Sequence, residues 1–300
     1  MDATVAVLLT AYDGEKYLRE QIESILSQTH GDIRLHIRDD GSNDGTTRIL
    51  GEYERDPRVS VSYGENIGTT RSIFTLLESA GDAPYYAFSD QDDVWLPDKI
   101  ERALSRLGPP QSNIPEACFC RLDIVTERLE HIAFTPLYKK PLGLTTAICG
   151  NILTGMACVV NKAARDLALG RPPEFTVMYD WWFFIVVSAF GKIYYDEVPS
   201  VLYRQHNKNV IGLKTGAGFA AARFKKYARG GYRKRISRQA NEFLRLFGED
   251  LGADEKKFLT EFASEKKILR RLAYAARCPA HRQNKFDDAL LRALIILNQL

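Results

Sequence analysis

The feature of this 300-residue chain that most constrains its fold is the alternation of short apolar runs with segments of helical spacing over roughly the first hundred residues. The first run, Val5–Thr10, is apolar at nearly every position, as expected of a strand covered on both faces. Further strands are predicted at Ile33–Ile37, Val59–Val61 and Tyr85–Ser89, and helices at Lys16–Gln28, Thr46–Tyr53 and Thr69–Ser79. This alternation predicts an α/β fold with a mostly parallel sheet and right-handed crossovers.

Polar residues follow the predicted strands at the points where the strands end. Ligands of such sheets bind outside the carboxyl ends of the strands. In this chain those ends carry Thr10–Asp13, Asp39-Asp40, Asn66 and Asp90–Asp93. One edge of the sheet is therefore expected to gather most of the polar residues of this half of the chain.

The last of these strand ends carries three carboxylates in the sequence Asp90-Gln91-Asp92-Asp93. Carboxylates that lie close together repel one another, and some take up protons unless a cation compensates them. Hard oxygen ligands suit Mg²⁺ or Mn²⁺, which in turn hold phosphates. The motif therefore indicates a site for a metal and a diphosphate ligand. The alternative is a solvated acidic turn that caps the helix beginning near Pro97.

Composition excludes several other classes of protein. With 45% hydrophobic and 26% charged residues the chain is typical of a soluble globular protein, and it has no apolar run long enough to span a membrane. The N-terminus lacks the features of a signal peptide, which predicts a cytoplasmic location. The five cysteines are scattered and are expected to be reduced thiols. Neither a dinucleotide fingerprint nor a Walker loop occurs, so a nicotinamide cofactor or ATP on a P-loop is not expected.

In the remaining two thirds of the chain, the sequence pattern changes at Gly212 from a mixture of strands and helices to long helices. Before it, mixed patterns predict strands at Cys118–Ile124, Ile152–Val160 and Val198–Tyr203 and helices at Lys162–Leu169 and Asp180–Phe190; after it, long helices are predicted at Phe219–Phe247, Lys256–Arg277 and Asp287–Leu300. Residues 1–213 carry 21 Lys and Arg against 29 Asp and Glu, whereas residues 214–300 carry 20 against nine. This contrast predicts a first domain over residues 1–212 and a basic helical region over 213–300.

Several short motifs occur in a fixed order along the first domain. They are Leu9–Gly14, Asp39–Thr46, Asn66–Gly68, Ser89–Asp93, Thr154-Gly155, Asp180–Trp182 and Tyr203–His206. Each is weak by itself, but their order and spacing together are specific. Over residues 4–212 the chain resembles a family 2 glycosyltransferase, and Tyr179–Gly212 resembles the bacterial rhamnosyltransferase-like branch of that family. The resemblance implies a GT-A fold, with a Rossmann-like, mostly parallel mixed sheet flanked by helices, in which residues 1–212 form the catalytic domain.

The resemblance also implies that the polar edge binds a nucleoside-diphosphate sugar. Thr10 and Tyr12 would hold the base, although Tyr12 could instead pack on the next helix. Asp39 would accept a hydrogen bond from a pyrimidine N–H, and Asp13 is a further donor-binding candidate. Asp40 is expected to fix the turn that follows it.

Four more residues are expected to contact the donor. Asn66 and Arg71 would flank the diphosphate, with a surface position on its helix as the alternative for Arg71. Asp90 would contact the sugar or the ribose, and Gln91 lies in the same motif.

A metal ligand is expected in each of two motifs. Asp92 is the expected direct ligand of the metal, and His206 is a candidate metal or phosphate ligand whose alternative is an ordinary surface histidine. Asp93 could instead cap the helix that begins near Pro97.

The acceptor side is expected around a second set of residues. An inverting glycosyltransferase needs a carboxylate that takes the proton of the acceptor hydroxyl, and the resemblance assigns this role to Asp180, with a plain helix cap as the alternative. Trp181 and Trp182 could stack on a sugar ring, one of them being expected in the core. Thr154 and Gly155 would lie beneath the sugar.

The basic region suggests a membrane partner. Its first predicted helix combines cations with aromatic residues, namely Lys225, Lys226, Arg229, Arg233, Lys234 and Arg235 with Phe219, Phe224, Tyr227 and Tyr232. Such a helix can lie on an anionic membrane surface, which suits a lipid-linked acceptor; the alternative is a helical appendage with a solvated basic face. No nucleic-acid-binding motif is found, so nucleic acid is not an expected partner.

Together these features predict a metal-dependent, inverting glycosyltransferase of the hexosyltransferase class. It would use Mg²⁺ or Mn²⁺ and a dTDP- or UDP-linked sugar, rhamnose being one candidate, and act on a glycan or lipid-linked acceptor in bacterial surface polysaccharide synthesis. It would be cytoplasmic, with a peripheral position on the inner face of the membrane. The alternatives are a sugar nucleotidyltransferase and an inactive scaffold for glycan assembly.

Overall fold

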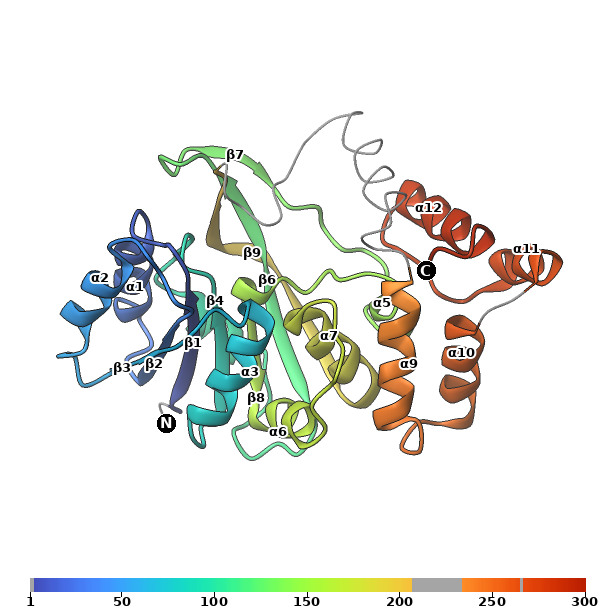
Figure 1. Cartoon of the computed structure of the whole chain (residues 1–300), viewed down its shortest axis with the longest axis horizontal. Coiled ribbons are helices and arrows are strands. Elements are labelled where there is room, and N and C mark those ends of the chain that lie inside the picture. The colour runs from blue at the N-terminus through green and yellow to red at the C-terminus, as the bar shows by residue number, and fades with distance from the viewer. Residues whose placement is uncertain (1–2, 207–233, 265–266) are drawn as a thin grey trace. The chain divides into compact units, whose positions relative to one another are not determined.

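The computed structural model in Figure 1 describes residues 3–206, 234–264 and 267–300. Contacts divide the chain into two compact units. The first comprises the described residues within 1–137, 153–170 and 190–210, and the second comprises those within 138–152, 171–189 and 211–300. The domain boundary predicted between residues 212 and 213 lies outside the described residues.

Within the described residues, the first unit is built around a sheet of nine strands in the order β3-β2-β1-β4-β8-β6-β9-β5, with β7 paired to β6. The strands are β1 (Val5–Ala11), β2 (Ile33–Asp39), β3 (Val59–Tyr63), β4 (Tyr85–Ser89), β5 (Val94–Trp95), β6 (Glu116–Val125), β7 (His131–Phe134), β8 (Cys158–Asn161) and β9 (Lys192–Arg204). The N-terminal strands β1 to β4 are mutually parallel, as predicted, and β6 is parallel to β9. Strands β5, β7 and β8 pair in antiparallel fashion.

Helices cover this sheet on both faces, because its central strands are apolar on both sides. All seven residues of β1 are buried. The helices are α1 (Leu18–Leu26), α2 (Thr46–Tyr53), α3 (Thr69–Ser79), α4 (Lys99–Leu104) and α6 (Lys162–Gly170). Helix α1 packs beside α2, and α3 packs beside α6 in front of the sheet in Figure 1. The predicted α/β fold with a mixed sheet flanked by helices is confirmed.

The second unit is helical in its described residues. It contains α5 (Leu144–Ala147), α7 (Tyr179–Phe190), α9 (Arg235–Phe247), α10 (Ala253–Ala263), α11 (Ile268–Arg277) and α12 (Lys285–Ile296). Helix α7 is apolar on all sides and therefore lies in a core. Helix α9 packs beside α10, and α11 beside α12. None of the described helices has the length and apolar character required to cross a bilayer.

Two predicted elements were wrong. The predicted strand Ile152–Val160 begins only at Cys158, because a 3₁₀ turn occupies Gly155–Ala157. A short apolar run does not by its periodicity distinguish a strand from a buried turn or helix. The predicted helix Lys256–Arg277 is two helices, since the backbone is extended at Ser264, after α10, and at Lys267, before α11.

The predicted membrane helix falls mostly outside the described residues. Of the predicted span Phe219–Phe247, the described part is α9 and the residue before it, Lys234. The cations and aromatic residues of the predicted basic cluster up to Arg233 are not among the described residues. Membrane contact through that cluster stays a prediction.

Candidate active site

The carboxyl ends of β1, β2, β3 and β4 meet at one edge of the sheet. The register places Ala11 beside Asp39 and Asp39 beside Tyr63. On the other side of β1, Leu9 lies beside Ser89. The loops that follow these strands therefore begin side by side, and the structure gathers the predicted polar residues of the four strand ends at this edge.

The loop after β1 is tied to the loop after β2 by side chains of both. The amide of Asp13 donates to Ser42 Oγ over 2.9 Å, and its carboxylate accepts from the amide of Asn43 over 2.8 Å. The amide of Gly14 donates to Thr46 Oγ1 over 2.8 Å. Asp13 has a left-handed backbone, with φ of 47°, which aspartate tolerates better than most residues. In this structure the Asp13 carboxylate ties two loops, and its contact with a donor stays a prediction.

Gln91 joins the ends of β1 and β4 through the backbone of Tyr12. The amide of Tyr12 donates to Gln91 Oε1 over 2.8 Å, and Gln91 Nε2 donates to the Tyr12 carbonyl over 2.9 Å. A Cβ at Gly14 would come within 2.3 Å of Gln91 Oε1, so a larger residue there would displace the Gln91 amide. The Tyr12 ring remains 45% exposed and is therefore not packed into the core, whereas Thr10 is buried.

Asp39 holds the turn after β2. Its carboxylate accepts from the amide of Ser42 over 3.1 Å and from Ser42 Oγ. We expected Asp40 to hold this turn, and that expectation was wrong. The two neighbouring side chains leave the strand on opposite faces, so Asp40 reaches a different loop.

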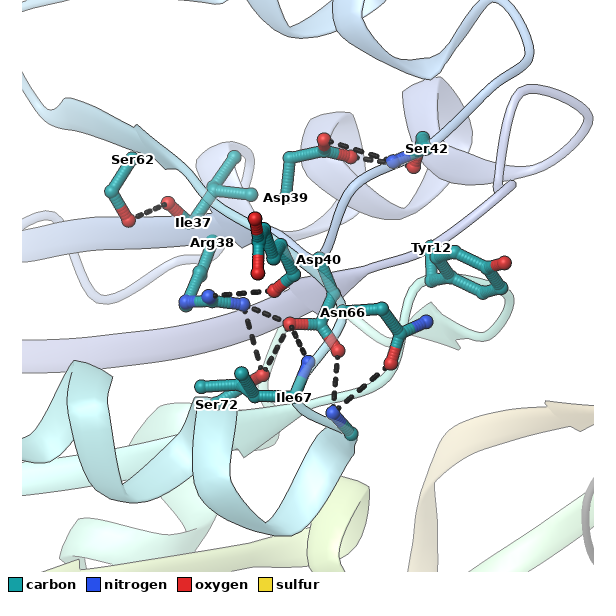
Figure 2. Close-up of polar contacts among 12 residues, drawn as sticks. Tyr12, Ile37, Arg38, Asp39, Asp40, Ser42, Ser62, Asn66, Ile67 and Ser72 are labelled. Carbon is teal, nitrogen blue, oxygen red and sulfur yellow. Dashed lines mark hydrogen bonds and ion pairs between the residues drawn. The ribbon is translucent and has the colours of Figure 1, made fainter.

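The Asp40 carboxylate organises the loop that leads into α3 (Figure 2). It accepts from the amides of Ile67 over 3.2 Å and Gly68 over 2.9 Å, and from Ser72 Oγ over 2.8 Å. It also forms a buried ion pair with Arg38. Burial works to raise the pKa of Asp40, but the hydrogen bonds and the Arg38 charge outweigh it and lower the pKa below its usual value. Asp40 is therefore a stably ionised, buried carboxylate.

The loop held by Asp40 carries Asn66. Arg38 Nη2 donates to the carbonyl of Glu65 over 3.0 Å, which fixes the residue before Asn66. Asn66 itself is exposed, with Oδ1 accepting from the amide of Gly68 over 3.1 Å. Arg71 is exposed in the first turn of α3. The structure thus places both predicted diphosphate contacts beside the N-terminus of one helix.

Asp92 and His206 meet although 114 residues separate them in the chain. Asp92 Oδ2 lies 2.7 Å from His206 Nε2. The imidazole ring also stacks on Tyr17, with 5.0 Å between ring centroids. Both side chains are partly buried, and Asp90 is half-buried beside them in the chain. The structure thus brings the two predicted metal ligands together.

Arg204 holds this arrangement and was not singled out from the sequence. Its Nε donates to the carbonyl of Asp92 over 2.9 Å, and its guanidinium pairs with Glu20 on α1. The same group lies over the Tyr17 ring at 4.6 Å. The sequence signal that could have identified Arg204 is its position as a charged residue at the end of an apolar strand, within the motif Tyr203–His206.

Asp93 does not cap a helix, contrary to one expectation, because α4 begins at Lys99 and is preceded by Asp98. Asp93 is fully buried, and its Oδ1 accepts from the amide of Arg204 over 3.1 Å. In the described part of the chain Asp93 Oδ2 has no hydrogen-bond partner. Burial, and then the charges of Asp92 and Asp90, raise the pKa of Asp93 well above its usual value. The surroundings of Asp93 therefore favour the neutral acid over the carboxylate.

The donor set at Asp92 and His206 fits a divalent cation that also binds phosphate. No cluster of three or more His, Cys, Asp or Glu side chains with metal-ligand geometry occurs in residues 3–206, 234–264 and 267–300. A carboxylate and an imidazole at one point supply two ligands. Mg²⁺ is usually bound through one or two carboxylates together with substrate phosphates and water, so two protein ligands suffice.

The remaining candidates divide between the two units. In the first unit, Thr154 is half-buried and Gly155 buried where the 3₁₀ turn begins. In the second unit, Asp180 is buried in the first turn of α7, and its Oδ1 accepts from the amide of Trp181 over 2.7 Å. Trp181 Nε1 donates to the carbonyl of Ala147 over 2.6 Å. The roles of these residues stay predictions.

Trp182 is a core residue, so it is the one of the two tryptophans that takes the expected core position, and the expectation that it lines the sugar pocket is corrected. It has no exposed surface. Its ring packs on Phe243 and Phe247 of α9 at centroid distances of 5.9 and 6.3 Å. A ring enclosed in this way has no free face for stacking.

Comparison with solved structures identifies the fold of this protein. The fold is similar to Staphylococcus aureus TarS in complex with UDP-GlcNAc, with a TM-score of 0.57, 14% identity, and coverage of 99% of this chain and 92% of TarS. It is also similar to the mannosyltransferase PcManGT of Pyrobaculum calidifontis in complex with GDP-Man and Mn²⁺, with a TM-score of 0.54, 15% identity, and coverage of 99% and 88%. The expected GT-A fold is confirmed.

Sequence comparison then gives the family that this chain resembles. Residues 6–148 match the model of glycosyl transferase family 2. The chain is 26% identical over 250 residues to the dTDP-rhamnosyl transferase RfbG of Shigella flexneri, covering 78% of this chain and 83% of RfbG. It is 39% identical over 102 residues to the putative teichuronic acid biosynthesis glycosyltransferase TuaG of Bacillus subtilis, covering 33% and 40%. The predicted resemblance to this family and its rhamnosyltransferase-like branch is confirmed.

Proposed function

We propose that this glycosyltransferase is metal-dependent and inverting. It moves a sugar from a dTDP- or UDP-linked donor, with dTDP-rhamnose as the first candidate, to a hydroxyl of a glycan or lipid-linked acceptor. The process is bacterial surface polysaccharide synthesis at the cytoplasmic face of the membrane. The contact between Asp92 and His206 at the polar edge of the sheet carries this proposal. The name of RfbG supports the choice of donor, and that of TuaG supports the process.

The donor lies along the ends of β1, β2 and β3 in this proposal. The exposed Tyr12 ring offers a face for the base, and Asp39 accepts a hydrogen bond from its N–H. Asn66 and Arg71 contact the diphosphate at the N-terminus of α3, where the helix dipole favours an anion. Asp90 contacts the sugar or the ribose.

Asp92 and His206 hold the cation. A bound Mg²⁺ or Mn²⁺ supplies positive charge that stabilises the leaving diphosphate. Tyr17 packs on the His206 ring and Arg204 lies over Tyr17, and these contacts support the proposed place of His206 beside Asp92.

Asp180 is the proposed base. Its carboxylate takes the proton of the acceptor hydroxyl while that oxygen attacks the anomeric carbon on the face opposite the diphosphate, which inverts the configuration. Trp181 is the proposed stacking contact of the acceptor, and Thr154 and Gly155 are the proposed contacts of the sugar. Asp180 lies in the first turn of α7, at the end of the helix where the helix dipole stabilises negative charge.

The donor site is tested by thermal stabilisation with a panel of nucleotide sugars and Mg²⁺ or Mn²⁺. A ligand that binds only the folded state at about 100 times its Kd stabilises it by about 2.7 kcal/mol. The wild type should be stabilised by one donor with metal, and Asp92→Asn and His206→Ala should lose this response. His131→Ala is the matched control, because His131 makes a similar contact with Asp123 and is not a proposed ligand. Equal responses in all variants would remove Asp92 and His206 from the site.

The base is tested by Asp180→Asn. Donor binding should stay near the wild-type level, and transfer should fall by about 10² to 10⁴-fold, the usual contribution of a general base. Transfer at near the wild-type rate contradicts the assignment.

NMR of the product gives the anomeric configuration. Pyrophosphate released from a sugar 1-phosphate and a nucleoside triphosphate would indicate a nucleotidyltransferase, and metal-dependent donor hydrolysis without acceptor argues against an inactive scaffold.

A further inference from the structure

Helix α11 of the second unit presents apolar side chains to solvent. Its buried side is formed by Tyr274 and Ala275. On the opposite side Leu269 is 78% exposed and Leu272 is 46% exposed. Ala273 and Ala276 are exposed as well, so the four residues follow the i, i+3, i+4, i+7 spacing of one helical stripe. We call Leu269, Leu272, Ala273 and Ala276 the outer stripe.

The apolar surface extends beyond the outer stripe at one end. Ile268 is 51% exposed in the first turn of α11. Arg271 Nη1 donates to the carbonyl of Ile296 over 2.7 Å, which brings the end of α12 beside this turn. Leu297, the next residue of that end, is 53% exposed. Exposed apolar side chains that gather on neighbouring elements indicate a contact site rather than a solvated face.

Cations flank the outer stripe. Lys267–Arg277 contains four Lys and Arg residues and no Asp or Glu. Three of the cations, Lys267, Arg270 and Arg277, line an open groove of about 790 Å³ together with Glu261 and Ser264 of the α10 end. The carboxylate of Glu261 lies 3.8 Å from Arg277 and only partly offsets the positive charge.

We propose that α11 lies in the surface of an anionic bilayer. Leu269 and Leu272 enter the boundary between headgroups and acyl chains, and Lys267, Arg270 and Arg277 contact lipid phosphates. Helices with an apolar stripe bordered by Lys and Arg bind membranes through both effects together. The charge also argues against a second copy of the chain as the partner, because a symmetric contact through this face would bring the cations of two helices together.

This contact is separate from the predicted basic cluster around Lys225 and from the donor site. It requires neither donor nor metal, so it can be measured on the full chain without either ligand. Its failure would leave the proposed transfer reaction untouched, and loss of transfer in Asp180→Asn would leave this contact untouched.

The first test is flotation with vesicles of phosphatidylcholine alone or mixed with phosphatidylglycerol. The wild type should float only with the anionic vesicles. Leu269→Gln with Leu272→Gln, and separately Arg270→Gln with Arg277→Gln, should each lower the partition coefficient at least about tenfold. Ile132→Gln is the matched control, since Ile132 is 48% exposed on β7 of the first unit and should leave binding unchanged.

Two outcomes of the flotation test would overturn the proposal. One is that Lys225→Gln, Lys226→Gln and Arg229→Gln together abolish binding while the α11 variants retain it. The other is a wild-type dimer in sedimentation that Leu269→Gln with Leu272→Gln dissociates, without vesicle binding. The first would assign the membrane to the predicted basic cluster, and the second would assign the outer stripe to a second copy.

A fluorophore reports the insertion directly. All five native cysteines are buried, so Leu269→Cys offers one accessible thiol for an environment-sensitive dye. Its emission should shift to the blue with anionic vesicles. The same dye at Glu249→Cys, a residue whose side chain is 93% exposed, should not shift. A shift at Glu249 and none at Leu269 would overturn the proposed orientation of α11.

Discussion

The ends of β2 and β4 carry the same pair of residues and use it differently. Asp39 ends β2 and Asp40 follows it, and Asp92-Asp93 follows β4, at one edge of one sheet. In each pair the second aspartate is buried, with 4% of Asp40 and none of Asp93 exposed. The pKa of Asp40 is nevertheless lowered, whereas that of Asp93 is raised.

The difference comes from the donors that meet each carboxylate. Asp40 accepts hydrogen bonds from two backbone amides and Ser72 and pairs with Arg38. Asp93 accepts one from the amide of Arg204. Burial by itself favours the neutral acid, and only several donors or a cation reverse this preference. A buried aspartate at this edge is therefore a fixed charge or a neutral acid according to its neighbours.

The largest expected effect is on stability at Asp40. Asp40→Asn removes the partner of Arg38 and leaves a buried cation unpaired, which should lower the free energy of unfolding by about 3–5 kcal/mol. Urea unfolding at neutral pH measures it. Arg38→Met with Asp40→Leu should recover much of the loss, because it removes both charges. A loss below about 1 kcal/mol in Asp40→Asn would contradict the ionised state of Asp40.

Asp92 and Asp93, the pair after β4, should differ in their effect on the rate of transfer. Asp92→Asn should lower transfer at least about 100-fold, which corresponds to about 2.7 kcal/mol of transition-state stabilisation. Asp93→Asn should lower it less than about tenfold, since Asp93 is buried away from solvent. Rates at saturating metal and donor measure both. Equal losses in the two variants would mean that the pair acts as one unit.

The smallest effect is expected on stability at Asp93. Asparagine resembles a neutral carboxylic acid, so Asp93→Asn should change the free energy of unfolding by about 1 kcal/mol or less. A loss comparable to that expected for Asp40→Asn would indicate that Asp93 is ionised.

The two aspartates should also give opposite pH dependence. The pKa of Asp93 is higher in the folded state than in the unfolded state, where it is about 4. The stability that Asp93 contributes is therefore complete below about pH 4 and is lost as the pH rises toward the pKa of the folded state. The wild type should accordingly lose stability relative to Asp93→Asn above about pH 4. With its lowered pKa, Asp40 contributes stability above about pH 4 that is lost as pH falls below it, so the wild type and Asp40→Asn should converge in acid. Unfolding curves across this range measure both, and slopes of the same sign would contradict the comparison.

The pattern of apolar and polar residues along the chain determined the helices and strands of the first unit and the edge of the sheet where the polar residues gather. Continuous apolar runs such as Val5–Thr10 predicted buried parallel strands, and parallel strands place their carboxyl ends together whatever the details of packing. The polar residues after β1, β2 and β4 could therefore be assigned to one site from their positions in the chain. Ile152–Val160 failed because an apolar run does not by itself show its backbone conformation.

Only the tertiary structure decided which side chains meet. Asp92 and His206, or Arg38 and the loop before α3, lie far apart in the chain, and no local pattern indicates their contact. The contact of Asp40 with the loop before α3, the enclosure of Trp182 and the raised pKa of Asp93 depend likewise on neighbours from distant segments. Hydrogen-bond donors and desolvation act over a few ångströms in space, so the state of a buried group follows from its packing rather than from its place in the chain.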